Sequence, residues 1–137
     1  MAVLILDSEA LSALARRQRS PQRHQLVRAA MRSAALRGEP VRVPSAVLLE
    51  LYRGGGADAP IDRELGRGYA RVVTAGLRIA RIAGHLLSQV GRGSELAVDA
   101  LVVATAIRFG GGLIVTHDPT DLELLAADHP NVRVVGV

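Results

Sequence analysis

Short runs of aliphatic residues alternate along the chain with longer stretches of helical periodicity, and this alternation limits the possible folds most strongly. The two clearest runs are Val3–Leu6, which ends at Asp7, and Leu113–Thr116, which follows three glycines. Weaker strand signals occur at Val41–Val43, Arg71–Thr74 and Val132–Val135. Short apolar strands that alternate with helices predict a parallel sheet covered on both faces, and therefore an α/β fold.

The helical stretches connect these runs one by one. Ser8 is expected to cap a helix through Ala15, and Ser94 to cap a helix that ends near Phe109. The remaining helices are predicted at Pro21–Arg37, Ala46–Arg53, Asp62–Gly66, Leu77–Val90 and Pro119–Asp128. The 137 residues contain no internal repeat or linker, so residues 1–137 are predicted to form a single domain.

The composition excludes several classes of enzyme and of binding module. All 17 basic residues are arginine, and the chain has neither lysine nor cysteine. Without lysine, a P-loop, Schiff-base chemistry and the receiver or haloacid-dehalogenase-like sites cannot operate in their usual form. Without cysteine, there can be no thiol nucleophile, disulfide or cysteine-based zinc site. An aromatic content of 2% argues against base-stacking platforms for nucleic acids.

The apolar segments are too short for secretion or for membrane insertion. The first apolar run is interrupted by Asp7, and the longest uncharged apolar stretch, Ala100–Ile107, is far shorter than a membrane span. We therefore expect a soluble, cytoplasmic protein with no membrane association.

Two aspartates follow the two clearest strands. Asp7 comes directly after the first strand, and Asp118 comes shortly after Leu113–Thr116. Ligands of open parallel sheets bind at the carboxyl ends of the strands, where the strand order reverses. If these two strands are neighbours, both acids lie at that place, because adjacent strands are about 4.8 Å apart. The alternative is that each aspartate caps the helix that follows it.

Two further acids stand in apolar helical contexts. Asp99 is the only charged residue between Glu95 and Arg108, in a helix that is apolar on all sides and is therefore predicted to be buried. A buried carboxylate needs an arginine, a metal ion or a water-filled cleft. Glu50 lies in a similar but shorter apolar run, and it could instead be an ordinary surface glutamate.

Taken together, four segments resemble the PIN-domain ribonucleases, and more narrowly the VapC-type toxins of bacterial toxin–antitoxin pairs. The segments are Leu6–Ser8, Pro44–Leu51, Val98–Ala106 and Val115–Leu122, and they span nearly the whole chain with their acids in the order of the family. The resemblance implies a single PIN-like domain with a five-stranded parallel sheet of order 3-2-1-4-5 and helices on both faces.

The resemblance also assigns roles to individual residues. It implies a catalytic and metal-binding acidic quartet, which consists of Asp7, Glu50, Asp99 and Asp118. It implies that Ser8 and Thr116 orient carboxylates or a metal-bound water. Asp121 matches a fifth acid found in some members, although it could equally be a helix N-terminal acid that interacts with the dipole. His117 occupies a variable position and receives no role.

An all-oxygen ligand set suits Mg²⁺ or Mn²⁺, and a bound cation would relieve the repulsion among clustered carboxylates. We therefore hypothesise metal-dependent hydrolysis of RNA phosphodiester bonds. The four histidines are scattered along the chain, which disfavours a metal-free acid–base ribonuclease.

The arginines and the acids are segregated along the chain. Residues 10–38 contain seven arginines and no acid, residues 65–94 contain five arginines and no acid, and residues 95–128 contain six acids and one arginine. This pattern suggests a basic rim around an acidic pocket, suited to binding phosphates. The alternative is that the arginines only make the protein soluble.

The resemblance implies two protein partners. One is a small VapB-type antitoxin with a DNA-binding part and a C-terminal segment that wraps the toxin, and the other is a second copy of the chain in a homodimer. The helix Leu77–Val90 is a candidate dimer surface, although its apolar stripe could belong to the core. The alternative functions are a PIN nuclease of RNA processing without an antitoxin, and an inactive PIN-like binding module.

Overall fold

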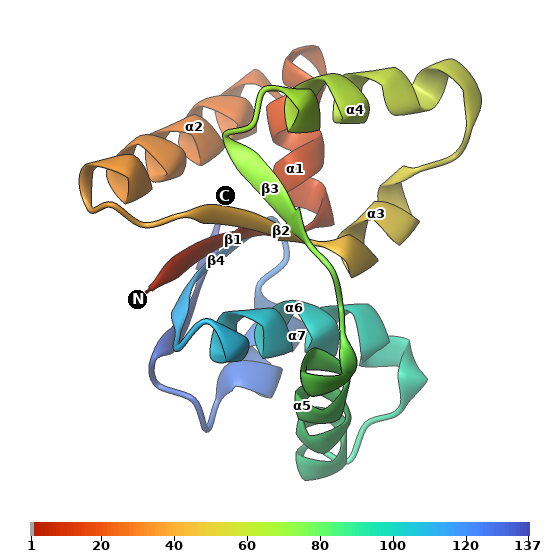
Figure 1. The fold of residues 1–137 in the computed structure, drawn as a ribbon, viewed down its shortest axis with the longest axis vertical. Coiled ribbons are helices and arrows are strands. Elements are labelled where there is room, and N and C mark those ends of the chain that lie inside the picture. Colours follow the sequence, from red (N-terminus) through yellow and green to blue (C-terminus); the bar gives the residue numbers. More distant parts are fainter. Residues whose placement is uncertain (1) are drawn as a thin grey trace.

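The computed structural model describes residues 2–137 and contains one parallel sheet with the strand order β3-β2-β1-β4-β5 (Figure 1). The strands are β1 Val3–Leu6, β2 Val41–Pro44, β3 Ala70–Val73, β4 Gly112–Thr116 and β5 Val132–Gly136. The predicted α/β class and the predicted 3-2-1-4-5 order are confirmed.

Strand β1 forms the centre of the sheet. All four of its residues are completely buried, as is typical of a parallel strand covered on both faces. It pairs with β2 on one side and with β4 on the other, and Leu6 stands opposite Val115 in the second pair. The edge strands β3 and β5 are partly exposed, which explains why their sequence signals are weaker.

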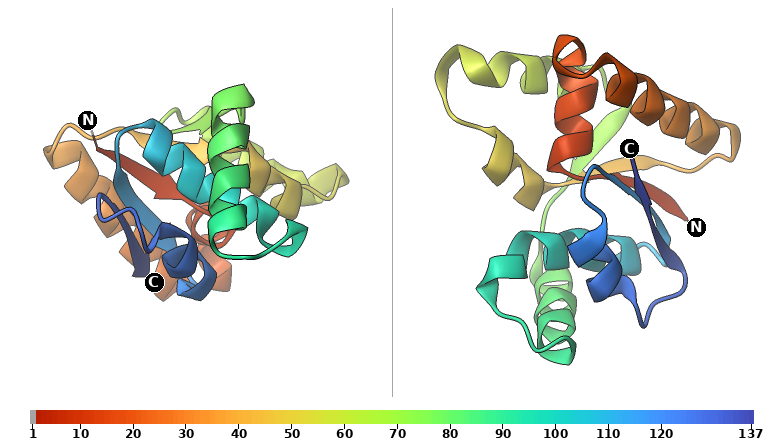
Figure 2. Two further views of the ribbon diagram at one scale, coloured as in Figure 1. Left: turned by 90° about the horizontal axis from the view of Figure 1, so that it is seen from below. Right: turned by 180° about the vertical axis from the view of Figure 1, so that it is seen from behind.

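Seven α-helices, within the described part of the chain, cover the two faces of the sheet. They are α1 Ser8–Ala15, α2 Pro21–Leu36, α3 Ser45–Leu51, α4 Ala59–Gly66, α5 Leu77–Gln89, α6 Ala97–Arg108 and α7 Thr120–Ala126. Helices α1, α2 and α4 lie on one face, and α5, α6 and α7 lie on the other (Figures 1 and 2). None of the helices described here has the length and hydropathy needed to cross a bilayer.

The starts of α1, α4 and α6 differ from the predictions, and α4 begins at Ala59 rather than near Asp62. The first helix is capped by Asp7 and not by Ser8, because the Asp7 carboxylate accepts the Ala10 N–H at 2.9 Å. Residues Ser94–Leu96 form a 3₁₀ turn, and the α-helix begins only at Ala97 without a side-chain cap. Asp99 therefore lies in the first turn of α6 rather than inside a longer helix.

The connection between α6 and β4 requires glycine. Gly111 has a φ of +117°, a conformation that other residues rarely adopt. A Cβ atom added to the next residue, Gly112, would lie 2.8 Å from Cγ1 of Val3 and closer still to the Val3 carbonyl oxygen. The glycine thus permits the close approach of β4 to β1 that fixes their register.

We predict that Gly112→Ala lowers the free energy of unfolding by roughly 1–3 kcal/mol, because the added methyl group must push β4 away from β1. The matched control is Gly84→Ala, in the middle of α5, where an added Cβ would meet nothing within 4 Å. The control should stabilise the protein by about 0.5–1 kcal/mol through its helix propensity. Urea denaturation of both variants tests this pair, and equal effects would contradict the close contact.

Candidate active site

Acidic side chains from four separate segments lie near the carboxyl ends of β1 and β4. They are Asp7, Glu50, Asp99, Asp118 and Asp121. We call this group the acidic cluster. Three of its supporting helices, α1, α3 and α7, directly follow strands β1, β2 and β4, so they begin at the same edge of the sheet. The start of α6 lies on the same side of the molecule as α3, and α3 packs against α6 (Figure 1).

Asp7 is the most buried member of the acidic cluster, with 8% of its surface exposed. Its backbone N–H donates to the Val115 carbonyl at 3.3 Å, which continues the β1–β4 pairing beyond β1. Burial raises the pKa of the Asp7 carboxyl to about 6, and the negative charges of Glu9 and Glu50 add to this shift. Hydrogen bonds from the Thr116 side chain and from the Ala10 N–H act in the opposite direction. The capping alternative is thus correct for Asp7, but capping leaves the carboxylate close to other acids.

Asp99 is half-buried in the first turn of α6. This position favours an acid through the helix dipole, yet the pKa of Asp99 is raised to about 6. The main cause is burial, followed by the negative charges of four other carboxylates, which are Asp121, Glu50, Asp7 and Asp118. In the described part of the chain, Asp99 belongs to none of the ion pairs, so the arginine partner considered from the sequence is absent.

The remaining three acids are Glu50, Asp118 and Asp121, and all three are more exposed than Asp7. Glu50, in the last turn of α3, and Asp118, after β4, are exposed, and Asp121 is half-buried in the first turn of α7. The exposure of Glu50 agrees with a surface glutamate, but its charge acts on both Asp7 and Asp99. The Asp118 carboxylate accepts only a long bond of 3.5 Å from the Thr120 N–H, so helix capping does not account for it.

Thr116 organises the turn that carries Asp118. It is buried, and its hydroxyl oxygen accepts the Asp118 N–H at 3.1 Å. The same hydroxyl lowers the pKa of Asp7 through a hydrogen bond, so it connects the ends of the two central strands. Ser8 is half-buried beside Asp7 at the start of α1.

His117, to which the sequence assigned no role, is held from two directions. Its Nε2 atom accepts a hydrogen bond from Arg23 of α2 at 2.7 Å, which leaves the proton on Nδ1 to bond the Val137 carbonyl at 2.8 Å. The Val137 N–H in turn donates to the Thr116 carbonyl. These contacts hold the turn that carries Asp118, and no sequence pattern indicated that Arg23 would reach this turn.

The chemistry of the acidic cluster fits a hard divalent cation. All of its side-chain donors are carboxylate oxygens, and two of the carboxyls have raised pKa values that a neighbouring cation would lower. Within residues 2–137, however, no three of the acidic or histidine side chains already stand close enough together to hold an ion. Binding would therefore require rotation of the exposed members of the cluster toward Asp7 and Asp99.

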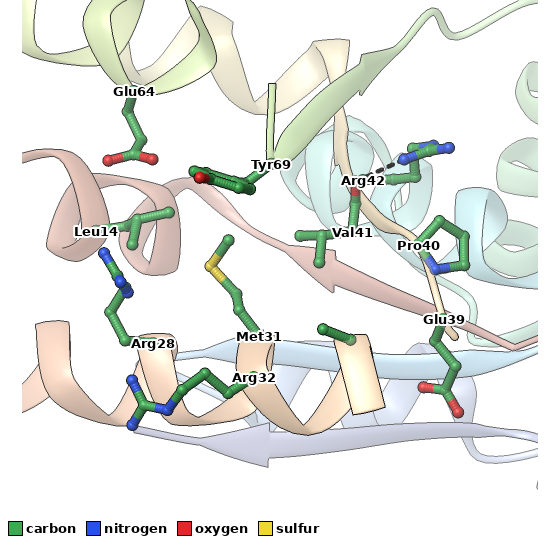
Figure 3. Close-up of a pocket in the computed structure, with 11 residues that line it drawn as sticks. Leu14, Arg28, Met31, Arg32, Glu39, Pro40, Val41, Arg42, Glu64 and Tyr69 are labelled. Atoms are coloured by element: carbon green, nitrogen blue, oxygen red, sulfur yellow. Dashed lines mark hydrogen bonds between the residues drawn. The ribbon is translucent and has the colours of Figure 1, made fainter. Parts of the chain in front are cut away.

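A separate cavity of about 430 Å³ lies between α2, β2 and α4, and none of the five acids of the cluster lines it. Leu14 and Met31 contribute to its apolar wall, and Met31 points toward the ring of Tyr69 (Figure 3). Glu64, which the sequence reasoning did not single out, is buried at its rim, 4.0 Å from Arg67. Glu64 lies three residues after the buried Ile61, so it falls on the buried face of α4, and this spacing is the sequence feature that indicates its burial.

The fold and the acidic edge of the sheet together define an α/β domain of the PIN type. The profile of the PIN domain family matches residues 4–126, so the chain belongs to the PIN domain family. Among curated proteins, none has a sequence that matches this chain.

Three solved structures have a similar fold. VapBC2 from Rickettsia felis bound to a fragment of its promoter DNA has a TM-score of 0.68 at 16% identity, and the alignment covers 98% of each chain. The DNA-bound VapBC from Salmonella typhimurium has a TM-score of 0.68 at 16% identity over 99% of this chain and 98% of the other. VapBC-1 from nontypeable Haemophilus influenzae has a TM-score of 0.63 at 14% identity over 98% and 97%. At these identities the similarity establishes the fold.

We predict that Asp7→Asn stabilises the protein at neutral pH in the absence of divalent ions. The folded-state pKa of about 6 lies above the usual aspartate value of 3.8, so wild-type stability should be highest below pH 4 and fall as the pH rises toward 6. This rise in the pKa corresponds to roughly 3 kcal/mol of lost stability at neutral pH. Asparagine retains the helix cap and removes the desolvated charge. Urea denaturation in EDTA across this pH range measures the effect.

Asp7→Ala separates the two contributions of this side chain. It removes the charge but also the helix cap, so it should be about 1 kcal/mol less stable than Asp7→Asn at every pH. Parallel pH profiles for wild type and Asp7→Asn would show that Asp7 carries no desolvated charge in the folded protein.

Proposed function

We propose that this protein is a metal-dependent endoribonuclease that acts as the toxin of a toxin–antitoxin pair. The observation that carries the proposal is the convergence of four carboxylates on Asp99, which lies in the first turn of α6, a helix with no other charge before Arg108. A group of acids without arginine partners is unfavourable for folding alone, since each carboxylate raises the free energy of its neighbours. Such sites are typical of functional centres.

We assign the binding of Mg²⁺ or Mn²⁺ to Asp7, Glu50, Asp99 and Asp118. A bound divalent ion supplies a hydroxide-like water and stabilises negative charge on the phosphate. The chain itself contributes rigid placement of the two buried acids, because Asp7 is fixed by its bond to Ala10 and by the β1–β4 pairing. Thr116 holds the turn that presents Asp118, and Ser8 and Asp121 support the cluster from the first turns of α1 and α7.

The toxin assignment draws its support from the three structural neighbours, all of which are VapBC complexes that align over nearly the whole chain. On this basis we propose a small VapB-type antitoxin as partner, RNA as substrate and the cytoplasm as the place of action. We also propose a homodimer, although the apolar stripe of α5 is largely used within the chain. Its residues Ile79, Ala83 and Leu86 are buried where α5 packs against α6, while Leu77 remains 71% exposed.

The complete set of acids disfavours an inactive PIN-like binding module, which would not need carboxylates in such an unfavourable cluster. A processing nuclease without an antitoxin has the same active site and differs only in its partner. Co-purification of the chain with the product of an adjacent short reading frame favours the toxin, and purification of an active nuclease without such a partner favours the processing enzyme.

We predict that induced expression of the wild-type chain stops growth and that the purified chain cleaves RNA in Mg²⁺ or Mn²⁺, whereas Asp99→Asn does neither. Loss of one metal-binding carboxylate should lower the cleavage rate by at least about 100-fold, since it removes about 2.7 kcal/mol of transition-state stabilisation. The matched control is Asp128→Asn, an exposed aspartate outside the acidic cluster, which should keep full activity. A harmless wild type that cleaves no RNA with either metal would refute the proposal, and full activity in Asp99→Asn would refute the assignment of the site.

A second prediction concerns Asp121. If its charge contributes to the metal site, Mn²⁺ should raise the thermal unfolding temperature of the wild type more than that of Asp121→Asn, because a missing ligand weakens binding to the folded state. Glu123→Gln is the matched control, because it removes one charge from an exposed position in the same first turn of α7. Equal Mn²⁺ responses of wild type and Asp121→Asn would remove Asp121 from the site.

A further inference from the structure

Two adjoining cavities on the α1–α2–α4 side of the molecule are lined by arginines. The larger, of about 560 Å³, is lined by Arg16, Arg17, Arg19 and Arg63, together with Ala15, Gln18, Gly56, Ala57 and Pro60. The smaller, of about 430 Å³, is lined by Arg17, Arg28 and Arg32, together with His24 and Gln25. They share Arg17, and no acidic residue lines either of them. We call the two together the arginine groove.

Most of these arginines have no internal partner. Arg16 donates to the Ser12 hydroxyl and to the Ala57 carbonyl, but the other five make no side-chain hydrogen bond within the described residues. The three ion pairs found in residues 2–137 use Arg37, Arg67 and Arg92. Like charges placed together without counterions repel one another, so the arginine groove is suited to an external anion.

The shape of the arginine groove indicates an extended polyanion. Arg28 and Arg32 lie one turn apart on α2 (Figure 3), and Arg17 lines one further cavity together with Arg28 and Arg63 of α4, so the arginines form a path rather than a single point. The one acid in this joining cavity is Glu64, which is buried and lies 4.0 Å from Arg67. Planar guanidinium groups bind phosphate oxygens in a bidentate manner. A chain of phosphates would provide one anion after another along such a path.

Helix α1 connects this path to the acidic cluster. Its N-terminus is capped by Asp7, and its C-terminus leads directly into Arg16 and Arg17. Eight helical residues span about 12 Å, which a few nucleotides of single strand can bridge. We infer that the arginine groove binds the phosphate backbone of the RNA strand on one side of the bond that is cut, an inference that rests on the proposed function.

An acidic peptide is the other class of polyanion that could bind here. Peptides that bind in grooves usually anchor themselves by apolar side chains in apolar pockets. Within the two cavities of the arginine groove the only apolar side chains are Ala15, Ala57 and Pro60. The apolar side chains around Met31 and Tyr69 line a further cavity, which adjoins the groove at Arg28 and Arg32. The composition of the groove therefore favours a phosphate backbone over a peptide.

The test is the salt dependence of RNA binding by the full chain in EDTA, which prevents cleavage by a divalent metal. The probe is a labelled oligouridylate of about 16 nucleotides, the upper range of a single-strand site. The double variant Arg17→Gln/Arg63→Gln should bind several-fold more weakly at low salt. The slope of log affinity against log salt should become shallower by about 1.4, since each lost phosphate contact on a single strand contributes about 0.7.

The matched control is Arg81→Gln/Arg108→Gln, which removes two exposed arginines from α5 and α6 on the opposite face of the sheet. This control should retain the wild-type slope, and all three proteins should unfold at similar temperatures because the substituted side chains are exposed. An unchanged slope in Arg17→Gln/Arg63→Gln, or an equal change in the control, would overturn the inference. So would a loss of affinity in the double variant for polyglutamate but not for oligouridylate.

These outcomes are separable from failure of the proposed function. A wild type that cleaves RNA in Mn²⁺ while the double variant keeps its salt slope refutes the arginine groove alone. A wild type that neither cleaves nor binds RNA refutes both.

Discussion

The parallel pairing of β1 with β4 determines where every functional group of this protein lies. From β1 the chain adds strands on one side through β2 and β3, and it then returns to add β4 and β5 on the other side. The order therefore reverses between β1 and β4, and the helices that follow these strands, α1 and α7, lie on opposite faces of the sheet (Figure 1). Asp7 and Asp118 leave the sheet at this point, and Gly112 permits the close approach of the two strands.

The acidic cluster places several negative charges at this point of the sheet, which is unfavourable for folding. Burial and neighbouring carboxylates raise the pKa values of Asp7 and Asp99 to about 6. The helix starts partly offset this cost, because Asp7 accepts the Ala10 N–H and Asp99 lies in the first turn of α6. Interactions that are unfavourable for folding are usually found at functional sites, and here the clustered carboxylates lie at one edge of the sheet. This concentration distinguishes the acidic cluster from Glu64, a buried acid with an arginine nearby.

The sequence allowed the strands and most helices to be predicted, because β1 and β4 are apolar throughout and the helices have clear periodicity. It offered both Ser8 and Asp7 as caps of α1 without deciding between them, because both are good caps and the choice depends on where β1 ends. It also extended α6 into Ser94–Leu96, since a single 3₁₀ turn is too short for its period to be distinguished from that of an α-helix. Contacts between distant segments, such as Arg23 with His117, leave no periodic signal in a sequence.

The sequence suggested a basic rim around an acidic pocket, but in the structure the arginines gather in separate places. The arginines of residues 16–32 gather beside α1 and α2, whereas Arg71, Arg78 and Arg81 lie on β3 and α5. Helix α1 separates acid from base along its own axis, with Asp7 at its N-terminus and Arg16 at its C-terminus. Both charges are placed favourably for the helix dipole, so the arrangement that separates a cation-binding edge from a phosphate-binding groove also stabilises the helix between them. In this helix, the residues that the proposed function requires at the two ends, Asp7 and Arg16, are also residues that stabilise the helix.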